Sequence, residues 1–101
     1  MAAYVVSEVS EVLDARLMED YRSLAQAAIE QHSGRYLVRG GTFETVEGNS
    51  ELRRIVIVEF PTMDKAREWY SSPEYAKALA VSQKALKRRL IFVEGVPQET
   101  R

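Results

Sequence analysis

Arg54–Phe60 reads RIVIVEF and has the clearest strand character in the chain. Four consecutive β-branched residues fill its centre, and such side chains suit the pleated surface of a sheet. Pro61 follows directly and ends the strand, because proline has no N–H for the hydrogen-bonded ladder. The segment therefore predicts a largely buried strand near the middle of the chain.

The chain upstream begins with a strand and a helix. Tyr4–Ser10 is rich in β-branched residues and predicts the first strand. Asp14 is a suitable N-cap for a helix that we expect to end at Gly34. The apolar residues between them recur at helical spacing and predict one buried face: Leu17, Met18, Tyr21, Leu24, Ala25, Ala28 and Ile29.

A second strand follows this helix. Arg35–Arg39 predicts the strand, and Thr42–Val46 resumes it after an interruption at Gly40-Gly41. A glycine pair inside a strand indicates either a bulge or a close approach of the backbone. Because this strand and Arg54–Phe60 are close in sequence, we expect them to form an antiparallel hairpin.

Two short helices and a last strand complete the chain. Thr62 is expected to cap the first helix, and Ser72-Pro73 to break it and start the second. Leu90–Glu94 predicts the last strand. Four basic residues are expected at the C-terminal end of the second helix, where the helix dipole favours positive charge: Lys84, Lys87, Arg88 and Arg89.

The resulting order, β-α-β-β-α-β with the second helix broken, is the ferredoxin-like pattern of the α+β class. It predicts an antiparallel four-stranded sheet with helices on one face. We expect a single domain over residues 1–96 and a frayed tail over 97–101.

Composition excludes several classes of protein. The chain has 101 residues, no cysteine and one histidine, so it offers no disulfide framework, cysteine nucleophile or histidine-rich metal site. No apolar run approaches the length that spans a bilayer, and no basic segment of a signal peptide precedes Tyr4, so a cytoplasmic protein is expected. A net charge of -1 and a strand without stacking aromatics argue against nucleic-acid binding.

The strands carry apolar residues on both faces. Ile55 and Ile57 alternate with Val56 and Val58, although helices on one side can cover only one face. Each large apolar side chain left in water forgoes about 1.5–3 kcal/mol. We therefore expect a homodimer that packs sheet against sheet; the alternative is a monomer that tolerates surface hydrophobic residues.

Three blocks carry a resemblance to a known family: Gly34–Gly41 (GRYLVRGG), Arg54–Pro61 (RIVIVEFP) and Trp69–Tyr75 (WYSSPEY). In order and spacing the chain resembles the domain-of-unknown-function 1330 family of the dimeric α+β barrel superfamily. The resemblance implies a ferredoxin-like fold and a homodimer, but no established reaction. Relatives in that superfamily include cofactor-independent monooxygenases, muconolactone isomerases and haem-degrading enzymes.

His32 and Glu59 are the candidate catalytic residues. His32 could act as a general acid or base or as a haem ligand, or else cap the last carbonyls of its helix. Glu59 interrupts an apolar run, so it is either a proton carrier with a raised pKa or a partner in a salt bridge at the strand end. Glu8 has a similar but weaker case.

Five residues are candidates for substrate binding. Arg39, beside the glycine pair, could bind a carboxylate or pair with Glu59 or Glu94. Four aromatic residues could line an apolar pocket or simply pack the helices onto the sheet: Tyr36, Trp69, Tyr70 and Tyr75. Arg53-Arg54 is interpreted as a solvated strand end.

Together these features predict a small homodimer with a pocket for a small anionic or aromatic metabolite. A cofactor-independent isomerase or a monooxygenase-like enzyme is compatible with them, and neither a metal nor a cofactor is called for. The alternative is a non-enzymatic ligand-binding or structural dimer, with an ion pair in place of the site.

Overall fold

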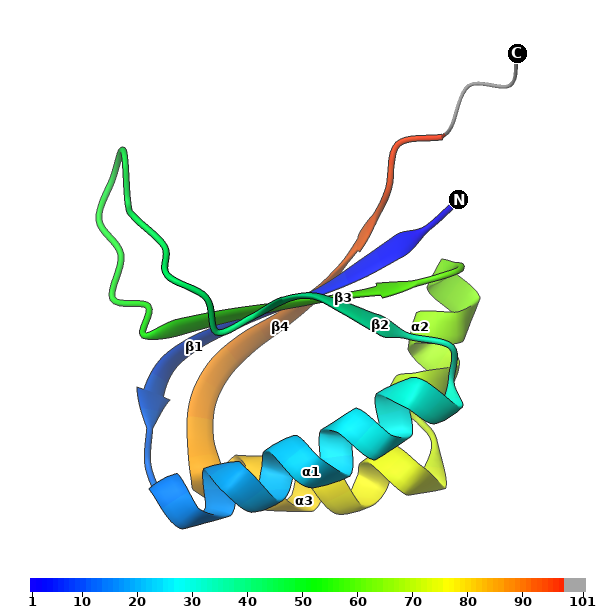
Figure 1. Ribbon diagram of the computed structural model, residues 1–101, viewed down its shortest axis with the longest axis horizontal. Coiled ribbons are helices and arrows are strands. Elements are labelled where there is room, and N and C mark those ends of the chain that lie inside the picture. The colour runs from blue at the N-terminus through cyan, green and yellow to red at the C-terminus, as the bar shows by residue number, and fades with distance from the viewer. Residues whose placement is uncertain (98–101) are drawn as a thin grey trace.

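The computed structural model describes residues 1–97, so the expected tail over 97–101, apart from Pro97, lies outside the described residues. Figure 1 shows a curved sheet with the helices on one side of it. The elements, in chain order, are β1 (Ala3–Val12), α1 (Ala15–Gln31), β2 (Arg35–Arg39), β3 (Arg54–Phe60), α2 (Met63–Tyr70), α3 (Pro73–Ala85) and β4 (Leu86–Glu94).

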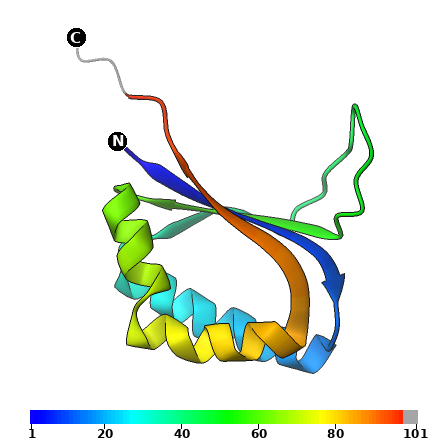
Figure 2. The same cartoon turned by 180° about the vertical axis from the view of Figure 1, so that it is seen from behind.

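The sheet has the strand order β2-β3-β1-β4, and every neighbouring pair is antiparallel. All helices lie against the same face, as the view from behind also shows (Figure 2). This arrangement confirms the predicted ferredoxin-like fold. Among the described residues, no helix combines the length and apolar composition needed to cross a membrane.

The core lies between the sheet and the helices. Alternate residues of β1 face the helices and are buried, whereas their neighbours face the other way and are half-buried. The register places Val5 between Val58 of β3 and Phe92 of β4 on the helix-facing side. The α1 stripe predicted from spacing is confirmed, since Met18, Ala25, Ala28 and Ile29 are all buried.

The end of α1 differs from the expectation in one residue. Ser33, not Gly34, adopts the left-handed conformation, with φ 66°. The N–H of Gly34 closes the helix by donating to the carbonyl of Ile29 at 2.9 Å. Gly34 is required for a different reason, because a Cβ there would lie 2.7 Å from Ile29 Cγ2 and 2.8 Å from Phe60 Cε1.

Replacing Gly34 by alanine is therefore expected to destabilise the protein by about 1–3 kcal/mol, the usual cost of overpacking a core. Gly41→Ala is the matched control, since no atom lies within 4 Å of a Cβ at that position. Urea unfolding of both variants measures the difference. Equal stability of Gly34→Ala and the wild type would contradict this packing argument.

Two predicted boundaries are wrong. Thr42–Val46 forms no strand; it belongs to a loop that rises from the sheet between β2 and β3 (Figure 1). The irregularity in β2 lies between Tyr36 and Val38 rather than at the glycine pair. The second wrong boundary is the end of the last helix. Helix α3 stops at Ala85, so Lys87, Arg88 and Arg89 belong to β4 and not to a helix.

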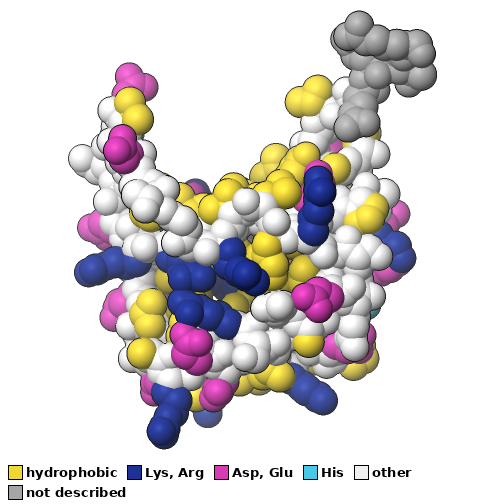
Figure 3. Space-filling model, viewed as in Figure 1, with side chains coloured by type: hydrophobic (Ala, Val, Ile, Leu, Met, Phe, Trp, Pro, Cys, Tyr) yellow, Lys and Arg dark blue, Asp and Glu magenta, His cyan; other side chains and the backbone are white. Residues whose placement is uncertain are grey.

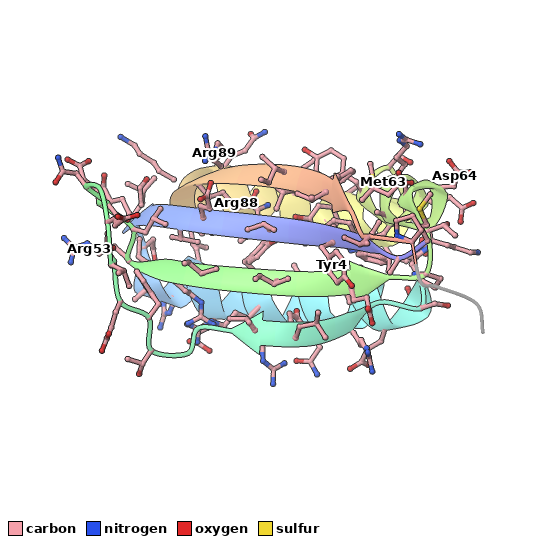
Figure 4. All side chains as sticks on the ribbon, turned by 90° about the horizontal axis from the view of Figure 1, so that it is seen from above. Tyr4, Arg53, Met63, Asp64, Arg88 and Arg89 are labelled. Atoms are coloured by element: carbon pink, nitrogen blue, oxygen red, sulfur yellow. The ribbon has the colours of Figure 1, made fainter. Side chains whose placement is uncertain are left out.

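The face of the sheet turned away from the helices, here called the outer face, is apolar along its centre (Figure 4). The register aligns one residue from each strand in a row across it: Val38, Ile57, Val6 and Ile91. Hydrophobic side chains line this upper surface in Figure 3. Within the described chain no element covers this row, and Ile91 remains 37% exposed.

Ion pairs flank the outer row on both sides. Arg35 Nε donates to Glu59 Oε1 at 2.6 Å on one side, and Arg89 Nε donates to Glu8 Oε1 at 2.6 Å on the other. Tyr4, labelled in Figure 4, also donates to Glu59, at 3.3 Å. The prediction of apolar residues on both faces is thus confirmed, with a charged border around the uncovered face.

Candidate functional site

A cavity of about 380 Å³ lies between the helix-facing side of the sheet and α1. All four strands contribute to its lining, and α1 forms the opposite wall. Its interior is mostly apolar, with Val5, Val58 and Leu90 from the sheet and Ile29 from α1. Figure 3 shows basic side chains gathered beside a hollow below the sheet. The cavity has the size and composition of a small-molecule site.

Strand register brings two arginines into this apolar space. Val9 pairs with Arg54 on one side and with Arg88 on the other, so all three share a row on the helix-facing side. Two strand spacings separate the arginine Cα atoms, which is on the order of 10 Å. The two guanidinium groups therefore approach the cavity from opposite sides of β1.

Arg88 forms a cluster with two phenols. It donates to Tyr21 Oη at 2.6 Å and to Tyr75 Oη at 2.7 Å, and the two phenol oxygens lie 2.8 Å apart. Its guanidinium also lies 4.9 Å from the centre of the Tyr21 ring. Burial and the neighbouring Tyr21 raise the pKa of the Tyr75 phenol well above the usual range and outweigh the opposing effect of Arg88, so the phenol stays protonated.

The break between α2 and α3 positions the aromatic side of the site. Ser72 Oγ donates to the carbonyl of Trp69 at 2.7 Å and accepts from the N–H of Tyr75 at 3.1 Å. These two bonds fix the helix start at Pro73 and bring the Trp69 and Tyr75 rings to 4.2 Å between centres. Trp69 borders the cavity, and its buried Nε1 has no hydrogen-bond partner among the described residues.

Basic residues also border the cavity on the β2 side. Arg39 donates to Gln26 Oε1 at 3.3 Å and lies over the Tyr36 ring at 4.6 Å. Arg54 makes no ion pair with any described residue, and its buried Nε has no partner there. Burial, with the nearby charges of Arg22 and Arg39, lowers the pKa of Arg54.

The structure brings together some of the residues predicted for the site. Tyr36, Arg39 and Trp69 line the cavity. Tyr75 reaches it through its hydrogen bond to Tyr21. Tyr70 is 38% exposed and packs beside Phe92, outside the lining.

His32 and Glu59 lie away from the cavity lining. His32 caps α1 through its backbone N–H, which donates to the carbonyl of Ile29 at 3.2 Å. Its side chain ties α1 to α3, since Nε2 is 3.0 Å from Glu74 Oε1. Glu59 is on the outer face in the pair with Arg35. Arg39 pairs with neither Glu59 nor Glu94; Gln26 and Tyr36 hold it instead.

Three residues of the site were missed from the sequence. Tyr21 fits the apolar stripe of α1, and its hydroxyl gives no separate signal there. Arg54 was interpreted as a solvated strand end, but it faces the cavity while its neighbour Arg53 is exposed. Arg88 was placed on a helix. Strand alternation from Leu90 and Phe92 back to position 88 was the signal that could have found it.

The described residues offer no cluster of three or more histidine, cysteine, aspartate or glutamate side chains that could hold a metal ion. The polar groups of the cavity are guanidinium groups, phenols, the Gln26 amide, the Trp69 indole N–H, two serine hydroxyls and the Glu19 carboxylate, which is paired with Arg22. This set can bind an anion and stabilise an oxyanion in an apolar space.

Solved structures with the same fold include proteins of known and unknown function. A protein of unknown function from Rhodopseudomonas palustris, RPA0582, has a TM-score of 0.78 and 17% identity, covering 96% of this chain and 84% of that one. SnoaB, a cofactor-independent oxygenase from Streptomyces nogalater, has a TM-score of 0.64 and 13% identity, with 96% and 94% covered.

A dimeric protein of unknown function and ferredoxin-like fold from Bacteroides fragilis has a TM-score of 0.62 and 13% identity, with 93% and 96% covered. No curated protein matches the chain. The model of one family, described as Domain of unknown function (DUF1330), matches residues 2–96. The chain therefore belongs to the DUF1330 family.

Proposed function

We propose that the protein is a homodimer in which each cavity binds a small anionic or aromatic metabolite that carries a phenol or an enol. The bound molecule is held in its deprotonated form, which is the reactive state for isomerisation or for cofactor-independent oxygenation. The observation that carries the proposal is the Arg88 guanidinium, fixed by Tyr21 and Tyr75 beside an apolar cavity.

Electrostatics support an oxyanion at this position. A guanidinium has five N–H donors, and Arg88 uses two of them on the phenol oxygens, so donors remain for a ligand. Because the Tyr75 phenol stays protonated, the cluster supplies hydrogen-bond donors rather than a competing negative charge. In an apolar surrounding these fixed donors favour a ligand oxyanion more strongly than water does.

The reaction class rests on the fold alone. SnoaB shares the ferredoxin-like architecture and is a cofactor-independent oxygenase, but at 13% identity it supports only an analogy. Loss of a proton from a phenol or enol raises its electron density, which is the common first requirement of oxygenation and of proton-transfer isomerisation.

A titration with 4-nitrophenol tests the oxyanion site. We expect the protein to increase the absorbance of 4-nitrophenolate at a pH where the free compound is mainly protonated. Arg88→Met and Tyr75→Phe should each reduce this increase. Arg89→Met is the matched control, because Arg89 is the next residue on β4 and pairs with Glu8 on the outer face. No increase with the folded wild-type protein, or an unchanged increase in Arg88→Met, would contradict the proposal.

A ligand-binding dimer without catalysis is the second candidate. Two observations favour it, because catalysis of this kind needs a group that accepts a proton. His32 and Glu59 lie outside the cavity, and Glu19, the carboxylate in its lining, is already paired with Arg22 at 2.6 Å. Incubation of the protein with a bound phenol in air separates the two. Conversion of the phenol, followed by chromatography, supports the enzyme, and its quantitative recovery supports the binding protein.

The homodimer accounts for the uncovered outer face. A two-fold axis through the sheet centre would place the aliphatic row of Val38, Ile57, Val6 and Ile91 against the same row of a second copy. The ion pairs of Arg35 and Arg89 would then border the interface, as polar rims border other interfaces. The similar protein from Bacteroides fragilis is dimeric, which supports a homodimer.

A further inference from the structure

We infer that Arg54, together with Arg39, forms a carboxylate-binding subsite at the β2 side of the cavity. This inference rests on the proposed function and names its ligand class: an aromatic acid whose carboxylate lies at this subsite and whose hydroxyl reaches Arg88. Arg54 selects the acid over neutral compounds of the same shape.

The charge around Arg54 is not balanced by the described residues. Arg22, Arg39 and Arg54 lie near one another, and Glu19 is the carboxylate that faces them. Glu19 is already paired with Arg22 at 2.6 Å. Arg39 has only the neutral partners Gln26 and Tyr36. The half-buried Arg54 and the exposed Arg39 therefore lack an ion-pair partner in the described chain, and the partial burial of Arg54 makes its unpaired charge unfavourable.

The absence of a side chain at Gly40 leaves room for the Arg54 guanidinium at this place. A Cβ at Gly40 would lie 2.6 Å from both Cζ and Nη1 of Arg54, so the guanidinium occupies the space that any other residue would fill. Gly40 has φ 73°, a left-handed conformation that favours glycine. Its N–H donates to the carbonyl of Ile55 at 3.0 Å, which fixes the glycine next to β3. Gly40 N–H is therefore engaged, and the arginines are the donors left for an anion.

The positions of the arginines define how a ligand would lie. Arg54 and Arg88 share one row on opposite sides of Val9, and Arg39 belongs to the adjacent row, opposite Val56. Arg88 is engaged by two phenols, whereas Arg54 is not. A molecule with a carboxylate at one end and a hydroxyl at the other matches these two sites, with its ring over the apolar residues between them.

The test compares 4-hydroxybenzoate with 4-hydroxybenzamide, which has nearly the same shape without the charge. Binding is followed by the fluorescence of Trp69, the single tryptophan of the chain, which borders the cavity. We expect the wild-type protein to bind the acid about 10- to 100-fold more tightly than the amide, the usual value of a charge-assisted hydrogen bond. Arg54→Gln should remove most of this preference, because it weakens binding of the acid more than binding of the amide.

Two further variants keep the test independent of folding. Arg53→Gln is the matched control, since Arg53 is exposed and outside the cavity lining, and it should preserve the preference. Gly40→Ala retains Arg54 but displaces its guanidinium, so it should weaken acid binding while thermal unfolding reports on the fold. Equal binding of acid and amide by the wild type, or an undiminished preference in Arg54→Gln, would overturn the inference.

The two proposals fail in different ways. If the protein binds the acid no more tightly than the amide but 4-nitrophenol still ionises on binding, the carboxylate subsite is wrong and the oxyanion site is retained. If neither benzoate compound binds and 4-nitrophenol is unaffected, both are wrong.

Discussion

Ile57→Glu is expected to convert the proposed dimer into a monomer. Ile57 lies in the centre of the aliphatic row on the outer face, between Val6 and Val38. In a sheet-to-sheet interface its carboxylate would be buried without a partner, which costs several kcal/mol. We therefore expect the dimer to weaken by at least about a hundredfold. Sedimentation velocity at micromolar concentration measures the change.

Leu13→Glu is the control for this experiment. Leu13 is also a large exposed hydrophobic residue, at 44%, but it lies after β1 and outside the outer row. It should leave the dimer intact. A wild-type protein that sediments as a monomer, or an Ile57→Glu variant that remains a dimer, would contradict the sheet-to-sheet arrangement.

Trp69→Ala should produce the largest loss of folding stability among the site residues. The indole is only 2% exposed and packs against Phe60 and Tyr75, with ring centres 5.4 and 4.2 Å away. Removing a large buried aromatic side chain usually costs about 3–5 kcal/mol. Urea unfolding followed by circular dichroism measures the loss.

Trp69→Phe refines the result, because it keeps an aromatic ring in the core but removes the indole N–H. We expect it to be clearly more stable than Trp69→Ala and to remain folded. A loss below about 1 kcal/mol in Trp69→Ala would mean that the side chain contributes little to packing, contrary to its burial among Phe60 and Tyr75.

The fold was predictable because its signals are local. Asp14, Thr62 and Ser72 cap the three helices as expected, and each side chain accepts a hydrogen bond from the first turn of its helix. The β-branched run from Ile55 to Val58 predicted β3 and the second apolar face. Such patterns depend only on neighbouring residues and on the period of a strand or helix.

The site was less predictable because tertiary contacts form it. The Tyr21–Tyr75–Arg88 cluster joins three elements that are distant in sequence. The boundary between α3 and β4 has neither glycine nor proline, so only the strand alternation back from Leu90 and Phe92 distinguishes the basic residues after Ala85 from a helix end. Arg53 and Arg54 differ only in which side of the sheet they face, and a bulge or a register shift changes that parity.

The most direct test of the proposed ligand binding in the cavity is the indole N–H resonance of Trp69, the single tryptophan, in a ¹H–¹⁵N spectrum during titration with 4-hydroxybenzoate. This N–H is buried at the cavity and has no hydrogen-bond partner among the described residues. We expect a saturable shift of this resonance and of the side-chain resonances of Arg54 and Arg88. Shifts that stay confined to surface amides, with the Trp69 resonance unmoved at saturating ligand, would contradict it.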